Sequence, residues 1–199
     1  MGKVSARCVL LRVCFGVVLC FSVAACQSES AEEYYNQALL AVNQDHYQQA
    51  IVLYSKAIAL DANYHEARAR LAFLLLEEGQ LALAKTHCDY LLNAKIYQQN
   101  PNYCLGLIAF KQANYPLAIT NFSEHLAYMP EYTSARYWLA KAHLANGEAE
   151  LAEAELNKAS SMFSHSVEAN LLMHEILVGL GKPEQAKPFR EQADFIRSY

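Results

Sequence analysis

Apolar residues are spaced in this chain as on the buried faces of paired helices, and the spacing recurs every 34 residues. The period is marked by five alanines, Ala50, Ala84, Ala118, Ala152 and Ala186. With each alanine counted as position 20 of a unit, apolar residues fall at positions 4, 7, 8 and 11 and again at 20, 24 and 27. Residues three or four apart share one face of an α-helix, so each unit predicts two amphipathic helices.

The units cover residues 31–64, 65–98, 99–132, 133–166 and 167–199, with no insertion or deletion between them. Small residues at positions 8 and 20 predict a close approach of the two helices. Position 15 is Gly79, Gly147 and Gly181 in three units, and a glycine there suits the left-handed turn that ends a helix. Pro116 and Pro183 stand where the second helices of their units should begin, a position at which a missing N–H costs little.

The pattern resembles the tetratricopeptide repeat, which has the same length and the same order of small, aromatic and proline positions. The segments 45–64 (DHYQQAIVLYSKAIALDANY) and 113–132 (ANYPLAITNFSEHLAYMPEY) carry the resemblance best. It implies an all-α fold, a right-handed superhelical solenoid of helix-turn-helix units. The fifth unit departs from the pattern, with His174 at position 8 and Arg190 at position 24. A polar outer face suits a last helix that no further repeat covers.

The first residues have the pattern of a secretory signal. Lys3, Arg7 and Arg12 precede an apolar run over 13–25, which is too short to span a membrane comfortably. The run ends in Val-Ala-Ala before Cys26 and resembles the bacterial lipobox, in which the cysteine is lipidated. We therefore expect a signal peptide over 1–25. An ordinary signal peptide followed by a chance cysteine and a retained membrane anchor are the alternatives.

Lipidation at Cys26 implies an envelope protein held by its N-terminus. By the same resemblance, Gln27 suits export to an outer membrane, where the protein would face the periplasm. Residues 26–30 form a short tether, since four extended residues span only about 14 Å. Without residues 1–25 the chain keeps 13 basic against 20 acidic residues, a formal charge of −7, which does not favour nucleic acid as a partner.

Two cysteines remain after the signal and the lipidation site, and both fall on helices that should be adjacent. In an oxidising periplasm Cys88 and Cys104 can form a disulfide, or they can stay as two buried thiols. His125, His143 and His174 occupy core-type positions, where histidines that donate hydrogen bonds to backbone or tyrosine are expected instead of a metal site. No cofactor is expected.

The resemblance also implies where partners bind, because first helices line the concave side of such a solenoid. The expected partner-binding residues are Tyr35, Arg70, Phe73, Tyr103, Phe110, Tyr137, Trp138 and Lys141. Exposed tyrosine and tryptophan are good anchors for a peptide or helix of a partner protein. The alternative is that half of these side chains pack against neighbouring second helices.

Enzyme signatures such as GxSxG, a P-loop or GxGxxG do not occur, so we expect a scaffold and not an enzyme. The lipobox and repeats together resemble pilotin-like lipoproteins of type IV and tight-adherence pili, which help to place an outer-membrane secretin. The resemblance implies a lipid-anchored periplasmic protein-interaction scaffold for an outer-membrane machine. An adaptor for outer-membrane protein insertion or for cell-wall enzymes is the alternative, and a metal-dependent enzyme on a helical scaffold is a remote one.

Overall fold

The computed structural model describes residues 29–198, which hold ten α-helices, two short 3-10 helices and no strand. The α-helices are α1 (Ala31–Asn43), α2 (Tyr47–Leu60), α3 (His65–Glu77), α4 (Leu81–Asn93), α5 (Pro101–Lys111), α6 (Tyr115–Tyr128), α7 (Thr133–Ala145), α8 (Ala149–Lys158), α9 (Val167–Gly179) and α10 (Pro183–Arg197). The 3-10 helices are η1 (Tyr97–Gln99) and η2 (Ser160–Ser164).

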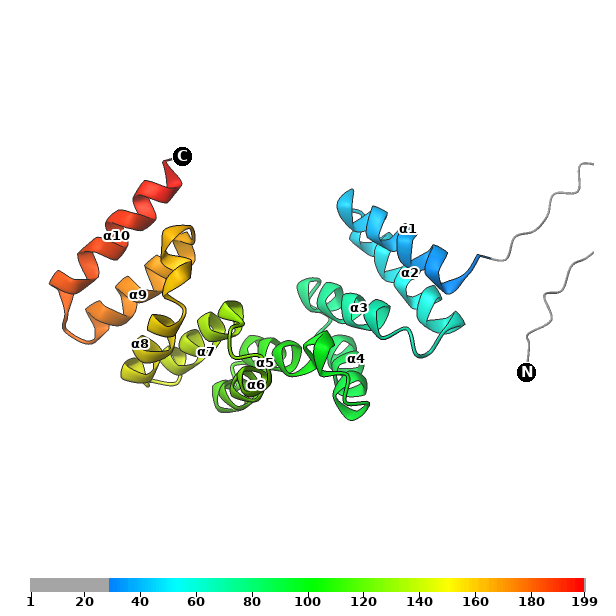
Figure 1. The fold of residues 1–199 in the computed structure, drawn as a ribbon, viewed down its shortest axis with the longest axis horizontal. Coiled ribbons are helices and arrows are strands. Elements are labelled where there is room, and N and C mark those ends of the chain that lie inside the picture. The colour runs from blue at the N-terminus through cyan, green and yellow to red at the C-terminus, as the bar shows by residue number, and fades with distance from the viewer. Residues whose placement is uncertain (1–28, 199) are drawn as a thin grey trace, which may run out of the picture.

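Successive helix pairs follow one another along an arc, from α1 and α2 at one end to α9 and α10 at the other (Figure 1). Helices α7 and α9 face the inside of the arc, whereas α8 and α10 lie outside. Each 34-residue unit contributes one such pair. The expected all-α solenoid is therefore confirmed.

All five turns at position 15 have the left-handed backbone conformation. The residues there, with their φ angles, are Asp45 (58°), Gly79 (75°), Ala113 (58°), Gly147 (81°) and Gly181 (71°). Glycine adopts this conformation without the steric cost that a Cβ brings. The position in the repeat therefore determines the turn geometry, whichever residue stands there. Asp45 and Ala113 adopt the left-handed conformation at a steric cost.

The small residues at positions 8 and 20 lie between the helices of each pair, as the pattern predicts. All five alanines at position 20 are fully buried, as are Ala38, Ala72 and Ala140 at position 8. In the fifth unit His174 replaces the small residue, and its Nδ1 lies 3.1 Å from the carbonyl oxygen of Ala186 at position 20. The histidine therefore joins the two helices by a polar contact where the other units use close packing.

The third unit begins differently from the others. The first helices of the other four units start at the first residue of the unit, but α5 starts at Pro101, two residues late, because η1 and the left-handed Asn100 precede it. At the N-terminal end Ser30, which we assigned to the tether, is the cap of α1. Its side chain accepts from the Glu33 N–H, while the Glu33 carboxylate accepts from the Ser30 N–H.

Candidate functional site: the concave groove

A cavity of about 620 Å³ lies between α1, α2 and α3. Its apolar lining comes from all three helices, and its charged groups lie on or directly after α3. The lining residues are Leu39, Val42, Asn43, Tyr47, Tyr54, Arg70, Phe73, Leu74, Glu77 and Glu78. We call the inner side of the solenoid, from this cavity to the aromatic side chains of α7, the concave groove.

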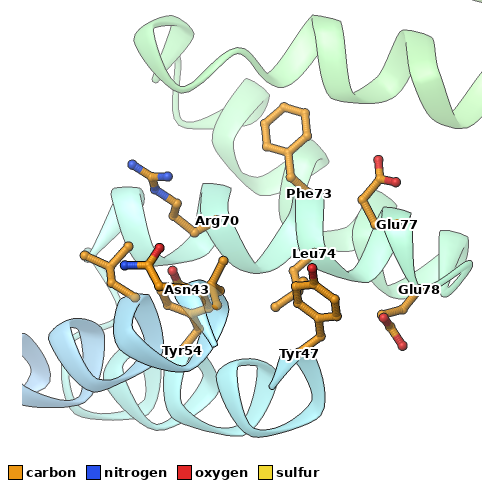
Figure 2. Close-up of a pocket in the computed structure, with 10 residues that line it drawn as sticks. Asn43, Tyr47, Tyr54, Arg70, Phe73, Leu74, Glu77 and Glu78 are labelled. Atoms are coloured by element: carbon orange, nitrogen blue, oxygen red, sulfur yellow. The ribbon is translucent and has the colours of Figure 1, made fainter. Parts of the chain in front are cut away.

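Three of the lining residues follow one side of α3, as the helical spacing predicts. Figure 2 shows Arg70, Phe73 and Glu77 pointing to the same side of that helix. The Arg70 guanidinium lies 3.8 Å from the Glu66 carboxylate, and both side chains are half exposed. An exposed pair of this kind contributes little to stability, so Arg70 is available for a partner.

Tyr47 and Tyr54 were missed by the sequence analysis, which assigned the groove to first helices alone. Both lie on α2 and close the cavity from below α3 (Figure 2). The Tyr47 hydroxyl donates to the Asp45 carboxylate at 2.7 Å, so the left-handed turn before α2 positions this ring. A tyrosine two residues after a turn residue was the only sequence signal for it.

Tyr35 was expected as an exposed partner contact, and this expectation is wrong. Only 7% of its surface is exposed, and its ring packs 5.0 Å from the ring of Tyr64. Its hydroxyl donates to the Glu66 carboxylate at 2.5 Å. Burial, and secondly this hydrogen bond, raise the pKa of Tyr35 to about 12. The second unit covers the position, so Tyr35 belongs to the joint between the first two units.

Tyr103 lies in the middle of the groove within a cluster of rings. Its centroid is 5.2 Å from Tyr132, 5.6 Å from His125 and 6.1 Å from Phe73. Burial raises the pKa of the Tyr103 hydroxyl well above its usual range. The residue therefore supports the groove, and its ring is only partly available to a partner.

A second aromatic surface joins α5 to α7. The rings of Phe110 and Trp138 are 5.2 Å apart, edge to face, and Tyr137 lies 5.7 Å from Trp138. The Lys141 ammonium lies 4.9 Å from the centroid of Trp138 and 5.7 Å from that of Phe110. Such cation–π contacts hold the ammonium over the rings without neutralising it. The structure thus brings together four of the five residues expected from units three and four, and Tyr103 is the fifth.

Cys88 on α4 and Cys104 on α5 are joined by a disulfide, with their Cα atoms 6.3 Å apart. Both are buried, and the bond ties the second unit to the third. Of the two alternatives left open by the sequence, the structure has the bonded one. Cys26 lies outside the described residues, so its lipidation stays a prediction.

The three core histidines do not gather into one site. His125 packs against Tyr132 with ring centroids 4.8 Å apart, while His143 lies 2.6 Å from the Glu148 carboxylate. Among residues 29–198, no group of three or more histidine, cysteine, aspartate or glutamate side chains is placed to hold a metal ion. His87 lies half buried on α4, and burial lowers its pKa.

The groove therefore offers an apolar cavity, aromatic rings and the cationic groups of Arg70 and Lys141 along one surface. That combination suits non-covalent binding of an extended or helical polypeptide. Within the described part of the chain, no helix is both long and apolar enough to cross a bilayer.

Solved structures with the same fold come from several proteins. One is "MamA 41-end from Desulfovibrio magneticus RS-1", with a TM-score of 0.73 and 17% identity over 84% of this chain and 95% of that one. Another is TTC0263, a thermophilic TPR protein of Thermus thermophilus, with a TM-score of 0.69 and 16% identity over 82% of this chain and 90% of that one. At such identities the likeness concerns the fold alone. None of the curated proteins matches the chain significantly.

The sequence itself also matches a family model. The tetratricopeptide repeat model aligns with residues 41–103 and 109–162, which together make more than half of the chain. These segments contain the first four turns, four of the five buried alanines and most of the groove described above. The chain belongs to the tetratricopeptide repeat family.

Proposed function

We propose that this protein is a lipid-anchored periplasmic scaffold that binds a polypeptide of an outer-membrane machine in its concave groove. The observation that carries the proposal is the continuity of the groove. The cavity beside Phe73 and the surface around Trp138 lie on the same inner side, and α5 connects them, because Tyr103 packs on Phe73 and Phe110 packs on Trp138. Two anchoring sites on one surface suit a segment of several turns or an extended strand better than a small molecule.

The charges of the groove favour a partner that carries both apolar and charged side chains. Arg70 and Glu77 lie on one side of the cavity, and Lys141 lies at the far aromatic surface. A partner with an apolar stripe and an acidic residue near the α7 end would match both features. This pattern differs from a uniformly basic clamp, since Glu77 and Glu78 border the cavity.

The membrane part of the proposal rests on the sequence. A basic start, an apolar run and Cys26 precede the first helix, and only residues 27–29 separate this cysteine from the Ser30 cap of α1. A tether of that length would hold the first unit close to the membrane surface. The proposed machine is a type IV or tight-adherence pilus secretin system.

The groove is tested by crosslinking in cells, followed by recovery of the protein from membranes. Phe73→Ala and Trp138→Ala each remove one anchor, so the main crosslinked partner should be recovered several-fold less. Leu83→Ala and Leu151→Ala are the matched controls, because these exposed leucines lie on the second helices α4 and α8. Equal recovery with all four variants would contradict the groove.

The identity of the recovered partner decides between machines. A secretin or pilus component supports the pilus role. A component of outer-membrane protein insertion, or a cell-wall enzyme, would replace that role while leaving the scaffold function intact.

The anchor is tested separately by fractionation. Cys26→Ser removes the thiol that would carry the lipid, so this variant should leave the membrane fraction. If it stays there, the lipid anchor is wrong.

A further inference from the structure

Position 4 of the first helix holds an arginine in two of the five units, and both arginines make the same kind of contact. Arg68 in the second unit donates to the carbonyl oxygen of Ala62 at 3.0 Å. Arg136 in the fourth unit donates to the carbonyl oxygen of Pro130 at 2.8 Å. Both carbonyls belong to position 32 of the preceding unit. Each guanidinium therefore fills the space beside the linker between two units.

The second helix of the same unit completes each arginine site. The Arg68 guanidinium stacks on the ring of Tyr90, with 3.8 Å between the guanidinium carbon and the ring centroid. The Arg136 guanidinium lies 3.1 Å from the Glu155 carboxylate. One site uses an aromatic face and the other uses a carboxylate, and both are common partners of a planar guanidinium.

The third unit has Asn102 at this position, and a hollow of about 300 Å³ lies there between η1, α5 and α6. We call this hollow the notch. It is lined by Tyr97, Asn102, Glu124, Ala127 and Tyr128. None of these residues lines the groove cavity. The notch is thus a separate surface feature, at the joint where the repeat register is interrupted by η1.

The notch has both kinds of group that hold Arg68 and Arg136. The rings of Tyr97 and Tyr128 lie 5.3 Å apart and tilted by 46°, and Tyr128 is 59% exposed. Glu124 is exposed and forms no ion pair with any residue of the described chain. Asn102 is 9% exposed, and its buried Oδ1 has no hydrogen-bond partner within residues 29–198.

We propose that the notch binds the guanidinium of an arginine side chain presented by a partner protein. An arginine from outside would take the place that the chain's own arginines fill in the second and fourth units. The tyrosine rings would stack on its planar face, and Glu124 would supply the opposite charge. A protein source follows from the repeat itself, since the groups that fill the equivalent sites are arginine side chains of a polypeptide.

The disulfide closes the chain segment that contributes η1 to the notch. Cys88 and Cys104 close a loop that contains both η1 and the start of α5, and hence Tyr97 and Asn102. Two of the five lining residues therefore lie in a loop whose ends are joined by a covalent bond. A preformed site loses less conformational entropy when it binds a side chain than a mobile loop does.

The test is an NMR titration of the full chain in a neutral detergent, with the tyrosine rings isotopically labelled. The probe is N-acetyl-arginine amide, whose two ends are capped as in a polypeptide. Resonances assigned by Tyr97→Phe and Tyr128→Phe should shift, with a dissociation constant on the order of millimolar. N-acetyl-citrulline amide has nearly the same shape without the charge, and it should bind roughly tenfold more weakly.

Two variants test the assignment of residues. Asn102→Arg places an arginine where the second and fourth units have one, so it should abolish the response to the probe. Glu124→Gln, a surface change that leaves the fold intact, should weaken the probe about fivefold, as expected for an exposed ion pair. Glu191→Gln on α10 is the matched control and should change nothing.

Three outcomes would overturn the proposal. They are equal shifts with arginine and citrulline probes, an unchanged response in Glu124→Gln, and tighter binding of free arginine than of the capped form. The last would mean that the α-amino or α-carboxyl group is recognised, and not a side chain. Trp138→Ala should leave the titration unchanged, so failure of the groove and failure of the notch can be told apart.

Discussion

Gly106 on α5 lies directly against the ring of Phe122 on α6. A Cβ added to Gly106 would stand 2.5 Å from Cε1 of that ring, closer than two carbon atoms can approach. Position 8 is alanine in three other units, and the third unit lacks the methyl group that would meet this ring. Phe122 is fully buried there.

We expect Gly106→Ala to destabilise the protein by about 1–3 kcal/mol, since the buried ring must shift or leave its rotamer. Chemical denaturation followed by circular dichroism measures the change. Gly179→Ala is the control, because a Cβ there meets nothing within 4 Å. Its stability should be unchanged or slightly raised. A Gly106→Ala protein as stable as the control would show that the contact is not a constraint.

Ala113 carries a cost that the equivalent glycines avoid. Its φ of 58° places an alanine in the left-handed region, at the position where Gly79, Gly147 and Gly181 stand in other units. We expect Ala113→Gly to raise the free energy of unfolding by up to about 1 kcal/mol. Ala154→Gly, at an exposed position inside α8, should lower it by about 1 kcal/mol. Thermal unfolding of both variants shows whether each change raises or lowers stability. A loss of stability in Ala113→Gly would contradict the backbone strain inferred at Ala113.

The register alone predicted much of this fold, because one packing arrangement is repeated. The buried alanines, the left-handed turns and the prolines at the starts of α6 and α10 all follow from helical periodicity. Position 15 is an example, since even Asp45 and Ala113 adopt the left-handed conformation that the glycines of the other units predict.

The candidate site was predicted less well, because side-chain exposure depends on the neighbouring unit. Tyr35 shares the helix face of Leu39, but the second unit covers it through Tyr64 and Glu66. Tyr54 lies on a second helix and still lines the cavity. The notch depends on a short Asn102 and on η1, and η1 breaks the periodicity from which the other elements were predicted.

The disulfide between Cys88 and Cys104 should contribute substantially to stability. The two cysteines are 16 residues apart, and closing a loop of that size removes unfolded-state entropy worth about 3 kcal/mol. We expect the Cys88→Ala, Cys104→Ala double variant to lose about that amount in urea unfolding. Treatment of the native protein with a reductant should give a similar loss, and the reductant should have no effect on the double variant. If the reductant also destabilised that variant, the loss of stability in the native protein could not be assigned to this disulfide.

Stability should depend on pH through His125, because its imidazole ring is buried and no acidic side chain of residues 29–198 is paired with it. Only 3% of it is exposed, its ring packs on Tyr132, and its Nε2 has no hydrogen-bond partner within the described residues. Burial lowers the pKa of His125 below the ordinary value of about 6.5. The unfolded chain therefore binds the proton at a higher pH than the folded chain. Stability from this group is complete above about pH 6.5 and declines as the pH falls below it.

We expect His125→Phe, which keeps a ring against Tyr132, to lose less stability than the wild type between about pH 7.5 and pH 5. Denaturant midpoints measured at both pH values give the comparison. His87 has its pKa lowered in the same direction, so part of the acid sensitivity should remain in the variant. His165→Gln, at an exposed position, should behave as the wild type does. If His125→Phe and the wild type lose the same stability on acidification, the pKa of His125 is the same in the folded and the unfolded chain. Burial among the rings would then not lower that pKa.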